Sequence, residues 1–205
     1  MNLFDSYAGC DPQLYPKFGK EAWYEGLYGY LSLRYFHIER RITEASRYVE
    51  ISAENKTTFS SEFASIIRDI GSTFGSLGDG LVKNTLVGLK REYDIRDYLK
   101  FIVDEVKDAE LIGVRLITPF THHFVFPFEN IKSSTPAWWI AYNNLKHSDI
   151  DNFKDGCLGN VVCGIASLAT LFVLMDNQGV FSHRSELLFD IGYYQPIAKV
   201  KTYSF

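Results

Sequence analysis

The sequence predicts an all-α protein, a bundle of four or five main helices with a minor β-hairpin. Three long segments carry apolar residues three and four positions apart, which is the spacing that gives a helix one apolar face. A fourth, shorter segment begins with residues typical of a helix start, and a fifth is apolar on all sides. Because a helix without a polar face must be surrounded by other elements, these segments together indicate a bundle.

Length, composition and charge indicate one globular domain over residues 1–205. Hydrophobic residues make up 46% of the chain and charged residues 22%, and the net charge is −4. An overall negative charge does not favour nucleic acid, so such a partner would require a local basic patch. Three cysteines lack the spacing of a metal site, and the N-terminus shows no secretory signal. We therefore expect a cytoplasmic protein with reduced thiols, no metal and no cofactor.

The N-terminal part of the chain predicts a leader followed by a long helix. Residues 1–20 contain many turn formers and should form an irregular leader that lies on the body. Apolar residues at helical spacing then predict a first helix over 21–50. Its aromatic residues, among them Tyr28, Tyr30 and Tyr35, are more than one core requires, which weakly supports burial against a second copy of the chain.

A second helix is predicted over 59–81, because apolar residues keep the three-four spacing over six turns. Glycines are costly inside a helix, but three of them lie on one stripe where another helix could approach closely. They are Gly71, Gly75 and Gly78. The alternative is a break near 78–80, after which a short helix resumes to Leu89. The sequence leaves both alternatives open.

The next segments predict a third helix and a hairpin. Residues 94–107 are amphipathic and should form a helix. Residues 111–118 and 124–128 are rich in β-branched and aromatic side chains, which favours a small β-hairpin. At the other end of the chain, the tail over 180–205 has extended, aromatic character and should pack back onto the bundle.

The apolar segment over 156–175 is about as long as a membrane-spanning helix and carries no charge. Polar residues such as Asn160 and Thr170, several glycines and the lack of a tight basic flank favour a buried central helix instead. We therefore expect no membrane partner. Asp149 or Asp151 is expected to cap the start of this helix.

The chain is organised around the segment that precedes this apolar helix. Thr135 followed by Pro136 predicts an N-cap with proline in the first turn, and the helix should continue to about Ser148. The i, i+4 and i+8 spacing places Trp139, Asn143 and His147 toward one face, with Lys146 beside them. An amide, an ammonium and an imidazole together suit an anionic ligand. The other side chains of this helix, Trp138, Tyr142 and Leu145, are expected in the core.

The run P-A-W-W-I-A-Y-N-N-L-K-H, followed by a short acidic turn and an apolar helix, resembles the C-terminal half of HEPN-superfamily proteins. The preceding P-F-E-N strengthens the resemblance, which covers about 127–174. Bacterial members carry a Pro-x-Trp-Trp-x-x-Tyr-Asn-x-x-Lys-His block just before their last long helix. The matching positions are Pro136, Trp138, Trp139, Tyr142, Asn143, Lys146 and His147.

The resemblance implies a HEPN-like helical bundle that forms a homodimer. Active members are metal-independent endoribonucleases, many of them in toxin–antitoxin or antiphage systems, so RNA and an antitoxin are the implied partners. By this resemblance His147 is the acid/base, Asn143 and Lys146 handle phosphate, and Trp139 and Asn144 contact the ligand. The family's signature arginine is missing, because the positions counted back from His147 hold no arginine. Lys146 can supply a point charge in its place but not a bidentate clamp.

Two functions therefore remain open. One is an endoribonuclease of a defence or stress system. The other is a catalytically inactive module that binds a nucleotide, RNA or a protein partner. A structural role is the alternative for each site residue: His147 could hydrogen-bond Asp149 or Asp151, Asn143 could cap backbone, and Trp139 could belong to the core.

Other polar groups of the sequence are weaker candidates. Adjacent strand positions point to opposite faces, so His122 and His123 do not suggest a metal pair. Arg40 and Arg41 could supply the missing cation if the first helix borders the motif, although a solvated face is the simpler interpretation. The same holds for His183 and Arg184 in the tail.

Overall fold

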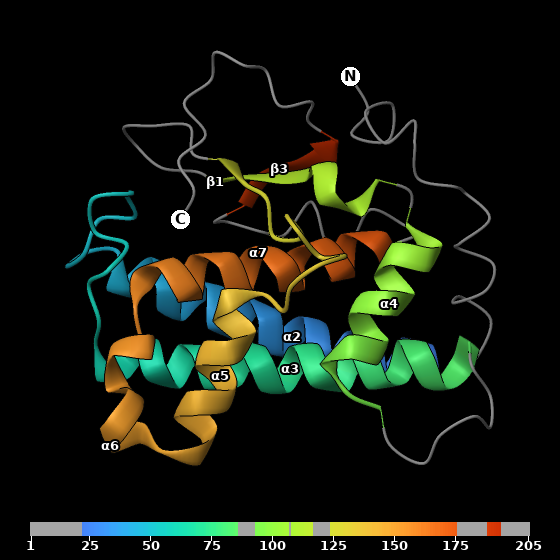
Figure 1. Ribbon diagram of the computed structural model, residues 1–205, viewed down its shortest axis with the longest axis horizontal. Helices are drawn as coiled ribbons and strands as arrows, with labels where there is room; N and C mark the ends of the chain where they lie inside the picture. The colour runs from blue at the N-terminus through green and yellow to red at the C-terminus, as the bar shows by residue number, and fades with distance from the viewer. Residues whose placement is uncertain (1–21, 86–92, 107, 117–123, 176–187, 194–205) are drawn as a thin grey trace.

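The computed structural model describes residues 22–85, 93–106, 108–116, 124–175 and 188–193 (Figure 1). Within these ranges the protein is mainly helical and carries a small antiparallel sheet. Its α-helices are α2 (Ala22–Ala45), α3 (Ser61–Thr85), α4 (Ile95–Glu105), α5 (Ala137–His147), α6 (Asp149–Asn152) and α7 (Leu158–Met175). Short 3-10 helices η2 (Ala109–Leu111) and η3 (Phe153–Asp155) precede the first strand and α7. The leader predicted over 1–20 lies outside the described residues.

The apolar helix α7 forms the centre of the bundle. It contacts α2, α3 and α5, and the sheet lies along its other side (Figure 1). Its described side chains from Val161 to Phe172 are buried almost without exception, so the prediction of a buried central helix is confirmed. Among the helices that the structure describes, none is both long and apolar enough to cross a membrane.

The sheet has three antiparallel strands in the order β2-β1-β3. They are β1 (Ile112–Leu116), β2 (Phe124–Val125) and β3 (Leu188–Tyr193). Val114 pairs with Val125 on one side and with Ile191 on the other. The first two strands lie where the hairpin was predicted, and the residues that join them are outside the described ranges. The third strand comes from the predicted tail, which no local pattern had identified as a partner of β1.

Helix α3 runs unbroken through Gly78 and Gly80 and ends at Thr85, so the break predicted as one alternative does not occur. Two of its glycines lie directly beneath aromatic rings of neighbouring helices. A β-carbon at Gly71 would come within 2.3 Å of the Tyr142 ring, and one at Gly78 within 2.7 Å of the Tyr98 ring. Packing of these rings against bare backbone offsets the intrinsic cost of glycine in a helix.

The start of α7 differs from the prediction. Asp149 and Asp151 do not cap it, because they belong to the separate short helix α6. The first amide groups of α7 are instead satisfied by the loop before α3: the Leu158 N–H donates to the Thr58 carbonyl at 2.9 Å, and the Gly159 N–H to the Lys56 carbonyl at 2.8 Å. A backbone segment remote in sequence thus replaces the expected side-chain cap.

Candidate functional site

The candidate site is built on α5, whose start lies one residue later than predicted. Pro136, with φ −56° and ψ 138°, occupies the N-cap position and Ala137 is the first helical residue, so Thr135 is not the cap. The extended ψ of Pro136 keeps it outside the helix. Its carbonyl nevertheless accepts the first helical hydrogen bond, from the Trp139 N–H at 3.0 Å. Proline suits this position because it has no N–H that would need a partner.

One stripe of α5 faces a groove between three helices. The stripe consists of Trp139, Tyr142, Asn143 and Lys146, at i, i+3, i+4 and i+7. Successive residues of a helix are rotated by about 100°, so Lys146 lies about 20° from Trp139 around α5 whereas His147 lies about 80° away. The seven-residue step therefore brings the ammonium, and not the imidazole, into line with the tryptophan.

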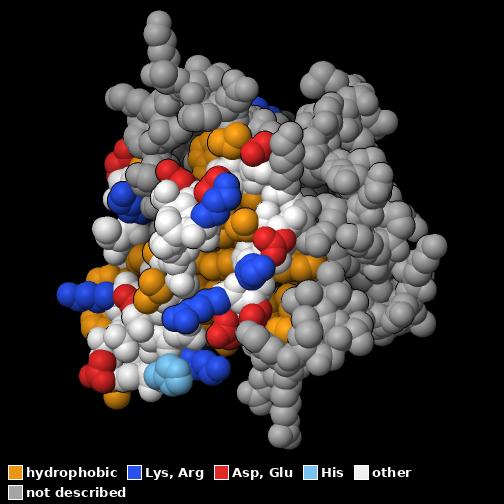
Figure 2. Space-filling model, turned by 45° about the vertical axis from the view of Figure 1, so that its right-hand side comes forward, with side chains coloured by type: hydrophobic (Ala, Val, Ile, Leu, Met, Phe, Trp, Pro, Cys, Tyr) orange, Lys and Arg blue, Asp and Glu red, His pale blue; other side chains and the backbone are white. Residues whose placement is uncertain are grey.

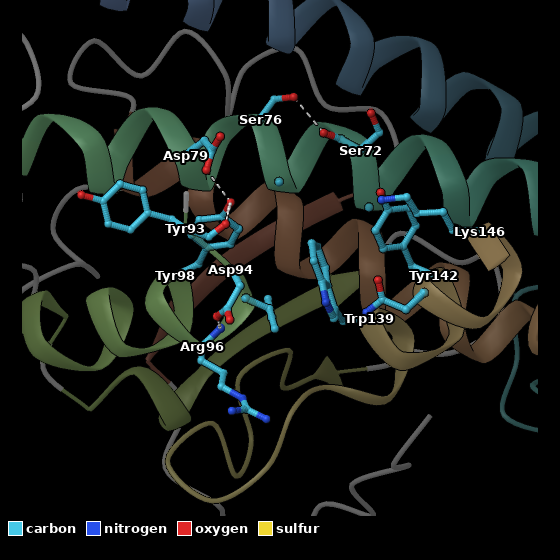
Figure 3. Close-up of a pocket in the computed structure, with 14 residues that line it drawn as sticks. Ser72, Ser76, Asp79, Tyr93, Asp94, Arg96, Tyr98, Trp139, Tyr142 and Lys146 are labelled. Atoms are coloured by element: carbon cyan, nitrogen blue, oxygen red, sulfur yellow. Dashed lines mark hydrogen bonds between the residues drawn. The ribbon is translucent and has the colours of Figure 1, made fainter. Parts of the chain in front are cut away.

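The groove has a volume of about 710 Å³ and lies between α3, the start of α4 and α5 (Figure 3). In Figure 3, Trp139 stands between Tyr98 on one side and Tyr142 on the other. The α3 wall presents the hydroxyls of Ser72 and Ser76. The remaining lining residues are Gly71, Gly75, Asp79, Tyr93, Asp94, Ile95, Arg96, Asn143 and Lys146.

Aromatic packing holds the α5 wall in place. Trp138 is almost completely buried and packs edge-on against Phe74 with ring centroids 5.1 Å apart. Trp139 is 8% exposed and lies 5.0 Å from the ring centroid of Tyr142, so its indole presents only an edge to the groove. Trp138 and Leu145 are core residues as predicted. Tyr142 differs from the prediction, because it packs on Gly71 and also borders the groove.

Cations and acids lie at different parts of the groove. The Lys146 ammonium is 5.8 Å from the centroid of the Tyr142 ring, which is within range of a cation–π interaction. At the α4 end, the Tyr98 hydroxyl donates to Asp79 Oδ1 at 2.6 Å. Burial and this hydrogen bond raise the pKa of Tyr98, so its hydroxyl stays protonated at neutral pH. Asp94 caps α4 by accepting from the Arg96 N–H at 2.8 Å.

The surface around α4 and α5 mixes both signs of charge. Figure 2 shows lysine and arginine side chains interspersed with acidic ones over the described part of this face, with hydrophobic side chains between them. The face is therefore not a uniform basic patch, and any attraction for an anion depends on individual cations such as Lys146 and Arg96.

Two of the predicted site residues lie outside the groove. His147 is exposed at the last position of α5 and does not line the groove. Its predicted carboxylate partners are engaged elsewhere: Asp149 forms an ion pair with Arg68, and Asp151 accepts from the Ser148 hydroxyl at 2.6 Å. Asn144 has a structural contact, because its side-chain amide donates to Asp155 Oδ2 at 2.7 Å and joins α5 to η3.

The arginines considered as substitutes for the missing signature residue are also accounted for. Arg41 binds Glu62 and Asp69 of α3, and Arg40 forms an exposed pair with Glu44. The arginine that lines the groove is Arg96, from α4, which the sequence did not single out. Tyr98 and Asp79 were missed as well. The spacing of the α3 glycines was the available signal, since it marked the face on which the aromatic walls now lie.

Within the described ranges, no group of three or more His, Cys, Asp and Glu side chains is arranged to hold a metal ion. His122, His123, His183 and Arg184 lie outside those ranges. Comparisons of the chain with protein-family models, curated proteins and solved structures found no match.

Proposed function

We propose that this protein is a catalytically inactive, HEPN-like module that binds a nucleotide, free or as part of an RNA, in the groove between α3, α4 and α5. The observation that carries the proposal is the placement of Trp139, Asn143 and Lys146 in one groove, with His147 outside it. A site with a cation, an amide and aromatic walls can bind a planar anion. Acid–base cleavage needs in addition a titratable group within hydrogen-bond reach of the scissile bond.

Each part of a nucleotide has a counterpart among the lining residues. The Lys146 ammonium suits a phosphate, and the half-buried Asn143 amide can both donate and accept hydrogen bonds. The aromatic walls offer the kind of surface on which bases pack, a contact worth about 1–3 kcal/mol per base. The hydroxyls of Ser72 and Ser76 lie along the α3 wall, within the same groove, and suit a ribose.

The test is a calorimetric titration of AMP, UMP and a six-nucleotide RNA into the wild-type protein and two lysine variants. Lys146→Ala should weaken binding about tenfold or more and reduce its dependence on salt concentration, because a phosphate contact is lost. Lys154→Ala is the matched control, since Lys154 is exposed but does not line the groove. Wild-type protein that binds none of the three ligands would disprove the proposal.

One observation favours a second function, metal-independent RNA cleavage. His147 is exposed directly after Lys146, and the described residues show no hydrogen bond to its imidazole. In a homodimer that brings two copies of α5 together, His147 could act as the acid/base. Under this function, His147→Ala should abolish RNA cleavage by at least about 10²–10⁴-fold, whereas His37→Ala, at an exposed histidine of α2, should not. Wild-type protein without cleavage at any concentration leaves the binding function alone.

A homodimer is part of the proposal in both cases, and an antitoxin or another protein is a further partner under the second. Support within the described residues is limited to exposed apolar side chains on α2: Tyr30 is 61% exposed and Leu33 67% exposed. Tyr35 is fully buried and does not contribute to such a surface. Light scattering that shows a monomer at high micromolar concentration would exclude the dimer.

A further inference from the structure

The floor of the groove contains one glycine that no side chain covers. Gly71 and Gly78 are buried beneath the rings of Tyr142 and Tyr98. Gly75 lies between them on the same stripe of α3 and is partly exposed. A β-carbon at Gly75 would find its nearest neighbour, Trp139 Cη2, at 3.7 Å, which is an ordinary van der Waals contact.

Helix packing explains two of these glycines but not the third. At Gly71 and Gly78 a β-carbon would collide with an aromatic ring, so the fold requires glycine there. At Gly75 alanine fits, and alanine stabilises a helix by about 1 kcal/mol relative to glycine. The fold alone would therefore favour alanine at position 75. A function of the bare backbone is the remaining physical reason for glycine at this point.

The dimensions of the uncovered surface suit a planar ring. Seven residues of α-helix rise about 10.5 Å, which is the separation of Gly71 from Gly78 along α3. A ring that lies on the backbone between them needs a contact distance of about 3.5–4.0 Å. A methyl group on residue 75 would occupy that layer and lift the ring away from the helix.

We propose that Gly75 determines the specificity of the groove, because its bare backbone is the surface on which the planar ring of the ligand lies. Trp139 borders the ring, and the ammonium of Lys146 binds an anionic substituent of the same ligand. This inference rests on the proposed function and adds the chemical class that the groove selects: planar aromatic anions rather than phosphates in general.

The experiment compares AMP with ribose 5-phosphate, which has the same phosphate and sugar but no ring. Both are titrated by calorimetry into wild type, Gly75→Ala and Gly29→Ala. The Gly29→Ala variant is the matched control, because Gly29 lies in α2 and a β-carbon there meets nothing within 4 Å. Both variants should raise the melting temperature. Only Gly75→Ala should weaken AMP binding, by about tenfold, while its binding of ribose 5-phosphate stays that of wild type.

Each other outcome has a defined meaning. If wild type binds AMP and Gly75→Ala binds it equally well, or if both ligands weaken equally, the inference fails and the proposed function stands. If wild type binds no AMP, both fail. Should Gly75→Ala not fold, spectra of ¹⁵N-glycine-labelled wild type decide: the Gly75 amide signal must shift with AMP and not with ribose 5-phosphate, and an unmoved signal overturns the inference.

Discussion

The ring of Tyr142 lies directly on the backbone of α3 at Gly71, so closely that a β-carbon on Gly71 would be 2.3 Å from the ring. The same ring is the surface over which the Lys146 ammonium lies, at 5.8 Å from its centroid. One contact between two helices thus fixes both the approach of α5 to α3 and the position of the cation in the groove.

Gly71→Ala should destabilise the protein even though alanine is the better helix former. Overpacking costs about 1–3 kcal/mol, and the gain in helix propensity of about 1 kcal/mol offsets only part of it. We expect the free energy of unfolding to fall by about 1–2 kcal/mol, measured by urea denaturation. In a Tyr142→Ala background the same substitution should become neutral or stabilising. If Gly71→Ala raises stability in the wild-type background, the ring does not rest on Gly71.

The two adjacent asparagines of α5 should separate binding from stability. Asn144→Ala removes a hydrogen bond to the Asp155 carboxylate and should lower the free energy of unfolding by about 1.5 kcal/mol. Asn143 faces the groove, so Asn143→Ala should change stability by less than about 0.5 kcal/mol and weaken AMP binding. Urea denaturation and calorimetry on both variants check this. The reverse pattern would place the ligand on the other side of α5.

Arg41 should stabilise the contact between α2 and α3. Its guanidinium is 18% exposed and donates to Glu62 at 2.8 Å, to Asp69 at 2.5 Å and to Ser65 at 3.0 Å. Arg41→Ala should cost about 1 kcal/mol, since its acidic partners are partly solvated. Arg40→Ala breaks one exposed pair with Glu44 and should cost at most about 0.5 kcal/mol.

Sodium chloride provides the second readout for the Arg41 pair. Because salt screens exposed charges, the difference between Arg41→Ala and wild type should shrink as the concentration rises from 0.05 to about 1 M. Equal costs for Arg40→Ala and Arg41→Ala would show that the network does not join the helices.

Cys163 should make the protein less stable at high pH. Burial raises the pKa of its thiol to about 12. The thiol in the unfolded chain ionises near pH 8.5, so the unfolded state loses its proton first. The stabilising contribution is complete below about pH 8.5 and is lost progressively as the pH rises toward about 12. Urea midpoints measured between pH 8 and pH 10.5 should fall more steeply for wild type than for Cys163→Ala. Parallel curves would contradict the prediction.

Sequence patterns identified the helices because those patterns act over one or two turns. The three-four spacing located α2, α3 and α4, and the uncharged run located α7. The glycine stripe of α3 correctly indicated a face for close approach, since glycine at three- and four-residue steps lines one side of a helix. The residues around α5 were recognised as a polar cluster for the same local reason.

Tertiary structure decided which of those polar residues share a site. Trp139, Asn143 and Lys146 meet Tyr98 and Asp79 only because α5 and α4 both pack on α3, from positions distant in sequence. The rotation of α5 that seats Tyr142 on Gly71 also turns Lys146 inward and leaves His147 exposed. Likewise, the cap of α7 comes from the backbone at Lys56 and Thr58. Spacing and capping residues are local properties that a sequence displays directly. The pairing of helix faces depends on how their surfaces fit, and that fit exists only once the chain has folded.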